Sequence, residues 1–278
     1  MNQYNATLEI AGVALRLGVA GLSSRHCEFL KAKYRLFEIA APVAQPISVH
    51  VACGGSGLPS PNYGNPIAQT DAAHLIRFRH RSLDATFDPV AMRVEAHAVA
   101  SGPHPVENLL RFVVSDRLIR NKGMLAHSAG ILTDAGALIC FGKSEAGKTT
   151  ISRKAGATAV FSDEMPAILC SGGAYEVYAT PFFGEMGRGE LCSHARLRYA
   201  CVLVGKDRRD AHVLKKSEAL QHLLGVAFCY SVDKDIEAFT VQWCQNIVDD
   251  MPVIALCSER DEPIKSIIER VEQALARA

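Results

Sequence analysis

The stretch Gly142-Lys-Ser-Glu-Ala-Gly-Lys-Thr149 matches the pattern G-x-x-x-x-G-K-[ST] of a phosphate-binding P-loop, the Walker A motif. A short apolar run at 137–141 precedes it and is typical of a buried strand. A segment that can begin a helix, 148–154, follows it and ends before Gly156. A glycine-rich turn between a strand and a helix directs backbone N–H groups and the positive helix end toward a phosphate. The sequence therefore predicts a nucleotide-binding loop at this point of the chain.

The residue types in the loop carry specific expectations. Lys148 is expected to reach the outer phosphates of a nucleotide, and the Thr149 hydroxyl to hold Mg²⁺. Alternatively, Lys148 and Thr149 merely begin an ordinary helix, but that reading leaves the two loop glycines unexplained. The residues expected to contact the nucleotide are Gly142, Lys143, Ser144, Glu145, Ala146, Gly147, Lys148, Thr149 and Thr150.

The composition is that of an ordinary globular protein. The chain has 278 residues, 49% of them hydrophobic, and a formal net charge of +1. This length fits one large domain or two small ones. Because there is no acidic or basic excess, no signal-peptide pattern and no apolar run of ~18 residues, we expect neither nucleic acid nor a membrane as a partner.

The nine cysteines are scattered, and no two of them show C-x-x-C spacing. Most lie in apolar surroundings, as Cys140 and Cys201 do. Buried, reduced thiols in a cytoplasmic protein explain this usage better than a zinc site or a disulfide framework does.

Hydrophobic periodicity predicts two regions, a β-rich one over 1–102 and a P-loop domain over 103–278. A hairpin turn at 133–136 is expected to lead into the P-loop strand. We expect an exposed loop at 58–66, which is rich in Pro, Gly and Asn. Strands are expected at 7–17, 47–53, 75–79, 85–87, 92–98, 124–132, 137–141, 157–161, 167–170, 175–179 and 197–204, and helices at 23–32, 103–120, 217–227, 235–249 and 263–276. The fold class is α/β, with a mixed sheet of the α+β kind.

Three side chains near the loop are candidates for catalysis. Asp163 and Glu164 follow the next apolar strand, and we expect the end of a strand beside the P-loop strand to hold Mg²⁺ through Asp163. The second carboxylate can accept a proton from an attacking hydroxyl. His127 lies in the expected strand upstream. Alternatively, Asp163 and Glu164 are simply a solvated strand end before Pro166, and His127 is an ordinary core histidine.

This arrangement resembles the catalytic domain of the HPr kinase/phosphorylase family, bacterial serine kinases whose fold is related to phosphoenolpyruvate carboxykinase. In that family a strand with a histidine precedes a hairpin, the P-loop and a strand that ends in Asp-Asp. His127, the loop 142–149 and Asp163-Glu164 stand at the matching positions, and the match covers about 124–165 with a weaker echo to about 205. The β-rich region resembles that of uncharacterised HPr-kinase-like proteins, some of them linked to peptide-modification gene clusters.

The resemblance implies a phosphoenolpyruvate-carboxykinase-like P-loop core that binds ATP and Mg²⁺. It places Lys148 on the phosphates, Thr149 and Asp163 at the metal, and Glu164 in the acid/base role. It also implies homo-oligomers and a reverse reaction with phosphate.

Several residues depart from the family pattern. Glu145 stands where the family usually has Gly, and a carboxylate there would repel phosphate by a few kcal/mol if desolvated. The second acidic residue is Glu164 rather than Asp, and Ser128 replaces a Gly after His127. The family's later segment with Glu and Arg around a Gly-rich turn is matched only loosely, by Glu185 and Arg188.

Three functions follow from these observations. The first is an ATP- and Mg²⁺-dependent kinase that phosphorylates a hydroxyl, a serine above all, of a protein or peptide. The second is a regulatory or scaffold module that binds nucleotide without turnover, for which Glu145 and the altered acidic pair speak. A P-loop motor or GTPase is disfavoured because the chain has no N-K-x-D motif and because a hairpin leads into the loop.

Overall fold

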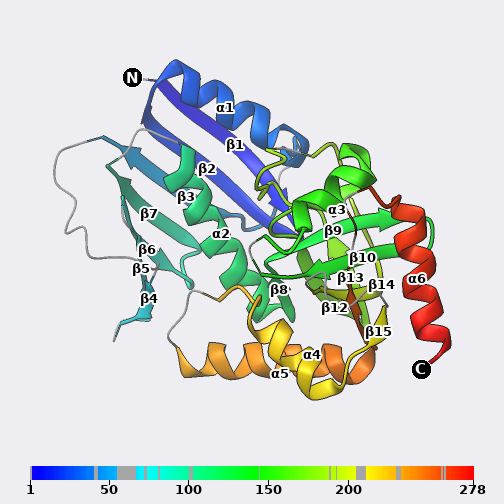
Figure 1. Cartoon of the computed structure of the whole chain (residues 1–278). Coiled ribbons are helices and arrows are strands. Elements are labelled where there is room, and N and C mark those ends of the chain that lie inside the picture. Colours follow the sequence, from blue (N-terminus) through cyan, green and yellow to red (C-terminus); the bar gives the residue numbers. More distant parts are fainter. Residues whose placement is uncertain are drawn as a thin grey trace. The chain divides into compact units, whose positions relative to one another are not determined.

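The structure is a computed structural model (Figure 1) that describes residues 2–40, 43–54, 67–71, 74–80, 82–99, 103–143, 145–187, 189–191, 193–204, 211–229, 233–257, 259 and 261–278. Ser144, Arg188 and the loop expected at 58–66 lie outside these ranges. The chain forms two compact units. One comprises Met1–Arg117 and Cys229–Glu237, and the other comprises Leu118–Phe228 and Ala238–Ala278.

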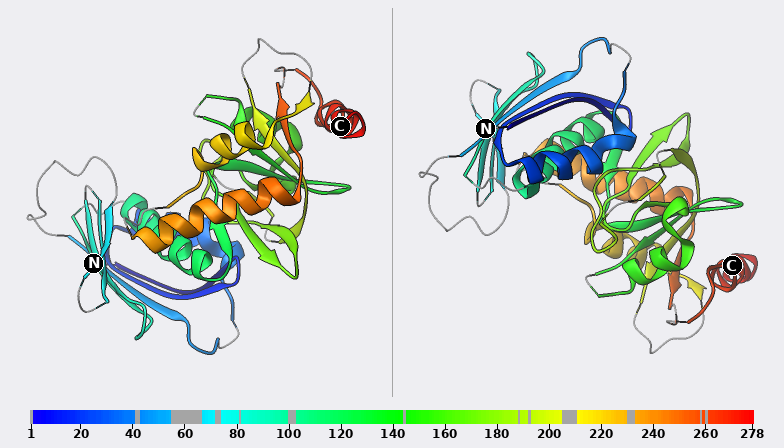
Figure 2. Two further views of the ribbon diagram at one scale, coloured as in Figure 1. Left: turned by 90° about the horizontal axis from the view of Figure 1, so that it is seen from below. Right: turned by 90° about the horizontal axis from the view of Figure 1, so that it is seen from above.

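The first unit is built on a seven-stranded sheet with the strand order β1-β2-β3-β7-β6-β5-β4. Its elements are β1 (Asn2–Ile10), β2 (Val13–Leu22), α1 (Ser24–Tyr34), the 3₁₀ turn η1 (Arg35–Phe37), β3 (Ile47–Cys53), β4 (Ile67–Thr70), β5 (Ile76–His80), β6 (Leu83–Asp88), β7 (Arg93–Ala98) and most of α2 (Pro103–Arg120). Alternate residues of β3 and β6 are buried, so one face of the sheet forms the core. Figure 2 shows α1 and α2 on the same side of this sheet.

Most elements expected in this unit are present. The strand over 47–53 and the helix over 103–120 have the expected bounds, and the meander at β5, β6 and β7 is antiparallel throughout. The strand expected at 7–17, with Gly12 as a possible bulge or turn, is in fact divided between β1 and β2, because Ala11 and Gly12, with φ of 50° and 78°, form a tight turn. The short strand β4 was not expected.

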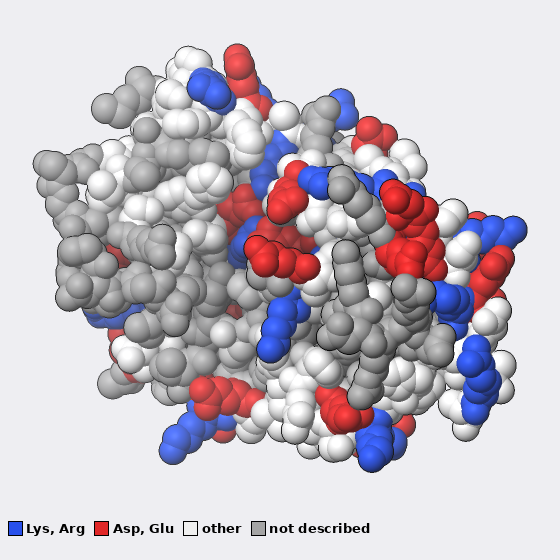
Figure 3. Space-filling view, viewed as in Figure 1, with Lys and Arg blue, Asp and Glu red and all other residues white. Residues whose placement is uncertain are grey.

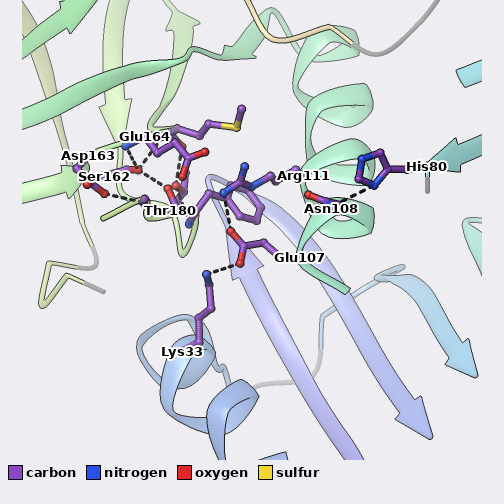
Figure 4. Close-up of polar contacts among 12 residues, drawn as sticks. Lys33, His80, Glu107, Asn108, Arg111, Ser162, Asp163, Glu164 and Thr180 are labelled. Carbon is purple, nitrogen blue, oxygen red and sulfur yellow. Dashed lines mark hydrogen bonds and ion pairs between the residues drawn. The ribbon is translucent and has the colours of Figure 1, made fainter. Parts of the chain in front are cut away.

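A buried charge cluster stabilises the packing of α1 on α2 within the first unit (Figure 4). The Glu107 carboxylate accepts hydrogen bonds from Lys33 Nζ and, at 2.6 Å, from Arg111 Nη2. The exposed fractions of these side chains are 9% for Glu107, 7% for Lys33 and 12% for Arg111. One carboxylate thus pairs with a cation from α1 and with a cation from its own helix α2.

The second unit contains a nine-stranded mixed sheet. Its strands are β8 (Gly123–Leu125), β9 (Ser128–Thr133), β10 (Gly136–Phe141), β11 (Val160–Ser162), β12 (Ala167–Ser171), β13 (Ala174–Tyr178), β14 (His194–Leu203), β15 (His212–Val213) and β16 (Val253–Leu256). Its helical elements are α3 (Lys148–Ala155), the 3₁₀ turn η2 (Ala157–Ala159), α4 (Lys216–Leu224), most of α5 (Lys234–Asp250) and α6 (Ile264–Ala276).

Strand β14 links the two parts of this sheet. Its first residues pair with β13 in antiparallel fashion, and its later residues pair in parallel with β10 on one side and β16 on the other. The path continues from β10 through β9 to β11. The packing of α3 and α6 on this part of the sheet buries Ile151, Ile267 and Val271 in one apolar cluster. The mixed α/β class is thus confirmed, whereas the phosphoenolpyruvate-carboxykinase-like core stays a prediction.

The hairpin that leads into the P-loop is present, with β9 antiparallel to β10. The single strand expected over 124–132 is wrong. Residues 123–125 form β8, which pairs with β12, and His127 lies in a bend before β9. The chain changes partners there because Ala126 N donates to Pro166 O and His127 N to Val226 O.

The described cysteines are all free thiols, and most of them are buried. Burial raises the pKa of Cys140 and of Cys244 to about 12. Among the described residues, no helix is long and apolar enough to cross a membrane. Acidic and basic side chains are interspersed on the face drawn in Figure 3.

The charge cluster generates a stability prediction with a matched control in the same unit. Glu107→Ala leaves Lys33 buried without the carboxylate that it pairs with and removes the ion pair of Glu107 with Arg111, so it should lower the free energy of unfolding by about 3 kcal/mol. Glu95→Ala breaks an exposed ion pair with Arg93 and should change the free energy of unfolding by less than about 0.5 kcal/mol. Chemical denaturation measures both. Equal effects of the two substitutions would show that the buried cluster contributes nothing special.

Candidate functional site

The described residues of the loop after β10 include a glycine with a positive φ at the start of α3. Gly147 caps α3 with φ of 103°, a conformation that favours glycine. A Cβ atom at Gly142 would lie 2.9 Å from Ala146 Cβ and 3.2 Å from Leu203 Cβ, so a larger residue there would crowd the loop's own Ala146 first and β14 second. Glu145 also has a positive φ, 66°, in the left-handed region. The loop thus holds a strained carboxylate at the position where the resemblance leads one to expect glycine.

Lys148 lies over the loop as the first residue of α3. Its Nζ donates to the carbonyl oxygens of Gly142 at 2.8 Å and Lys143 at 2.9 Å. Burial lowers the pKa of Lys148, while the nearby carboxylates of Glu164 and Asp163 act in the opposite direction. The ammonium group is therefore close to both acidic residues, and it must leave the two carbonyls in order to contact a phosphate.

Asp163 fastens a turn to the end of β11. Its side chain is buried, with 2% exposed, and its Oδ1 accepts from Gly184 N at 2.8 Å and its Oδ2 from Met186 N at 3.2 Å (Figure 4). The turn is closed by Gly187 N, which donates to Gly184 O. Both Asp163 oxygens thus already have partners in the protein, and they hold the segment 184–187 against the site.

Glu164 is half-buried and adjoins the same turn. A Cβ atom at Gly184 would lie 3.1 Å from Glu164 Oε2, which shows how closely the turn approaches this carboxylate. Ser162 Oγ accepts from the backbone N–H groups of Glu164 and Met165, at 3.1 and 2.8 Å, and donates to Phe182 O. The hydroxyl fixes the backbone, so Glu164 faces the loop while Asp163 is held by the turn.

These residues line one pocket of about 600 Å³ in the second unit. The pocket is lined by His127, Glu145, Gly147, Lys148, Thr149, Thr150, Arg153, Asp163, Glu164, Gly184 and Glu185. The three expected catalytic residues and most of the loop therefore lie together. Gly142, Lys143 and Ala146 form the loop without lining the pocket.

We expected the acidic pair to follow a strand adjacent to β10. This is wrong, because β9 lies between β10 and β11. Both β10 and β11 are antiparallel to β9, so they run in the same direction. Their carboxyl ends therefore lie at the same edge of the sheet, which brings Asp163 and Glu164 to the loop.

Sequence reasoning missed Arg153 and Gly184. Arg153 is the fourth residue after Thr149, and this spacing on a helix would have placed both on one face. Glu185 was considered only as part of a loose match to the family's later segment. Gly184 carried no local signal, because its place in the pocket wall depends on the distant Asp163, which accepts from its N–H group.

The described residues of the pocket lining carry an excess of negative charge. Among them are four carboxylates, those of Glu145, Asp163, Glu164 and Glu185, and two cations, Lys148 and Arg153, which leaves two negative charges in excess. Oxygen donors of this kind suit Mg²⁺, which takes one or two carboxylates and completes its shell with substrate phosphates and water. No group of three or more His, Cys, Asp or Glu residues in the described part of the chain could hold a metal by itself. The residues present fit a metal that arrives with a nucleotide.

The chain matches no protein-family model and no curated protein.

The two acidic residues should differ in what they do for stability. Asp163→Asn turns an amide N–H toward a backbone donor, so it should cost about 1–3 kcal/mol of unfolding free energy. Glu164→Gln should cost about 1 kcal/mol or less, because this side chain is only half-buried. Thermal and urea unfolding of the two variants would test the assignment, which a larger loss for Glu164→Gln would contradict.

Proposed function

We propose that this protein is an Mg²⁺-dependent kinase that transfers the γ-phosphoryl group of ATP to a hydroxyl, a serine above all, of a protein or peptide. The observation that carries the proposal is the position of Lys148 at the start of α3, in one pocket with Thr149 and Glu164. A cation, a hydroxyl and a carboxylate at the start of a helix are the groups that phosphoryl transfer requires.

The roles follow from the geometry. Lys148 would turn from the carbonyls of Gly142 and Lys143 to the phosphates, and the backbone N–H groups of the loop would surround them. The acceptor oxygen forms a bond to the γ-phosphorus, the bond to the bridging oxygen breaks, and ADP leaves. Glu164 takes the hydroxyl proton, because its carboxylate lines the pocket. His127 lines the pocket, and its role in catalysis stays a prediction.

The charge balance explains the need for a divalent cation. An anionic nucleotide would be repelled by a lining with two excess negative charges, which bound Mg²⁺ would neutralise. Thr149 Oγ1 and the acidic pair would hold the metal. Since both Asp163 oxygens already accept N–H groups, its share in metal binding would be the smaller one.

A cytoplasmic location, homo-oligomers and the reverse reaction with phosphate remain parts of the same proposal. The reduced thiols fit a cytoplasmic protein, where ATP is supplied.

The test is a calorimetric titration with Mg-ATP. Wild type should bind it, and Lys148→Ala should weaken binding by about 10- to 100-fold, because a charge-assisted contact to phosphate is lost. Chelation of Mg²⁺ should remove binding by wild type. Glu164→Gln should bind Mg-ATP but release no ADP in the presence of acceptor proteins. Unchanged binding by Lys148→Ala would exclude the P-loop reading.

Two observations favour a second function, a module that binds nucleotide without turnover. Glu145 places a carboxylate in the phosphate-binding loop, and both oxygens of Asp163 are used by the turn. In the titration described above, such a module would bind Mg-ATP. It would not transfer phosphate to any acceptor.

Reversion of Glu145 tests this alternative. Glu145→Gly relieves a left-handed conformation and removes a charge, so it should raise stability by about 1 kcal/mol and strengthen Mg-ATP binding. Glu145→Ala removes the same charge but keeps the strain, so it should strengthen binding without the gain in stability. Unfolding and titration separate the two effects. Phosphoryl transfer that arises only in Glu145→Gly would favour the inactive module for wild type.

A further inference from the structure

Arg153 belongs to the wall of the pocket, although no P-loop pattern includes it. It stands on α3, one helical turn after Thr149, and lines the pocket with Lys148. Its Nη2 lies 3.3 Å from Glu185 Oε2, on the turn that Asp163 holds. The pocket therefore has a basic and an acidic side chain opposite each other.

The pair is easily exchanged for another partner. The exposed fractions are 59% for the Arg153 side chain and 74% for that of Glu185, so the pair is worth at most about 1 kcal/mol. A phosphate offers the guanidinium two parallel, charge-assisted hydrogen bonds, which are stronger than one long contact to a carboxylate. An arriving phosphate would therefore displace Glu185 from Arg153.

The backbone of Glu185 cannot simply move away. Its neighbours Gly184 and Met186 donate their N–H groups to the buried Asp163 carboxylate. The carboxylate of Glu185 consequently stays near the guanidinium as a competitor. Of the described lining residues, only Lys148 and Arg153 are cationic, and Lys148 stands at the base of the loop.

We infer that Arg153 binds the terminal phosphate of the nucleotide and that Glu185 competes with this phosphate for the guanidinium. The inference rests on the proposed nucleotide-binding function. Since ADP lacks the third phosphate, it leaves the pair of Arg153 and Glu185 intact. The pair thus lets the site distinguish ATP from ADP.

A double-mutant cycle with two nucleotides tests this inference. Mg-ATP and Mg-ADP are titrated into wild type, Arg153→Gln, Glu185→Gln and the double variant. Arg153→Gln should weaken Mg-ATP binding by about tenfold and Mg-ADP binding by less than about twofold. Glu185→Gln should strengthen Mg-ATP binding by about threefold, because the competitor is lost. The double variant should behave like Arg153→Gln, because without the guanidinium Glu185 has nothing to compete for.

Lys154→Gln is the matched control. It removes a positive charge from the next position of α3, where Nζ donates to Glu259 O and does not line the pocket. If Lys154→Gln weakened Mg-ATP binding as much as Arg153→Gln, general charge would explain the effect and the inference would be overturned. Equal losses for Mg-ATP and Mg-ADP in Arg153→Gln would overturn it as well.

The two proposals fail in different ways. If wild type and Lys148→Ala responded alike to Mg-ATP, the nucleotide site itself would be refuted and the inference with it. If binding depended on Lys148 but Arg153→Gln bound Mg-ATP like wild type, only the role of Arg153 would be lost. Thermal unfolding checks that each variant is folded. The side chains of Arg153 and Glu185 are exposed, so we expect their variants to fold like wild type.

Discussion

The parallel pairing of β10 with β14 determines where everything else in the second unit's pocket lies. It runs from the pair Ala137 and Leu197 to the pair Phe141 and Val202, and the chain then turns at Gly142 against Leu203. A side chain at Gly142 would crowd Ala146 in the loop and Leu203 on β14. Because β11 runs in the same direction as β10, its end delivers the acidic pair to the same edge. Binding at the carboxyl ends of parallel strands is common in α/β proteins, and here one hairpin strand separates the two contributors.

Two adjacent carboxylates perform separate tasks because their surroundings differ. Asp163 is buried and accepts two backbone N–H groups, so it acts as a structural link between β11 and the turn at 184–187. Glu164 is half-buried, and the Ser162 hydroxyl holds its backbone. The first carboxylate positions the wall of the pocket, and the second lines the pocket.

Local patterns predicted the elements that local physics determines. Helix α2 and strand β3 have clear periodicities, and the hairpin into the loop has a clear turn, so their positions could be predicted. His127 could not be placed, because an apolar run does not reveal that the chain changes partner strands at Ala126. Strand β16 was not expected, and its four buried apolar residues pair in parallel with β14.

The composition of the pocket shows the same division. The loop and the acidic pair could be recognised from the sequence because each consists of consecutive residues with a characteristic pattern. The structural task of Asp163 depends on N–H groups about twenty residues away, and the close approach of Gly184 to Glu164 likewise joins distant parts of the chain. The opposition of Arg153 and Glu185 likewise arises from tertiary structure, since 32 residues separate them in the chain.

The chain returns to the first unit after it has built most of the second, because Cys229–Glu237 belongs with Met1–Arg117. During synthesis the first unit is therefore still incomplete when the loop at 142–149 has left the ribosome. It is completed only by residues that follow β15 and α4. Domains usually fold one after another from the N-terminus. In this protein the first unit to begin synthesis cannot be complete before most of the second unit has been made. A cut of the chain at any single position would leave at least one unit without part of its residues.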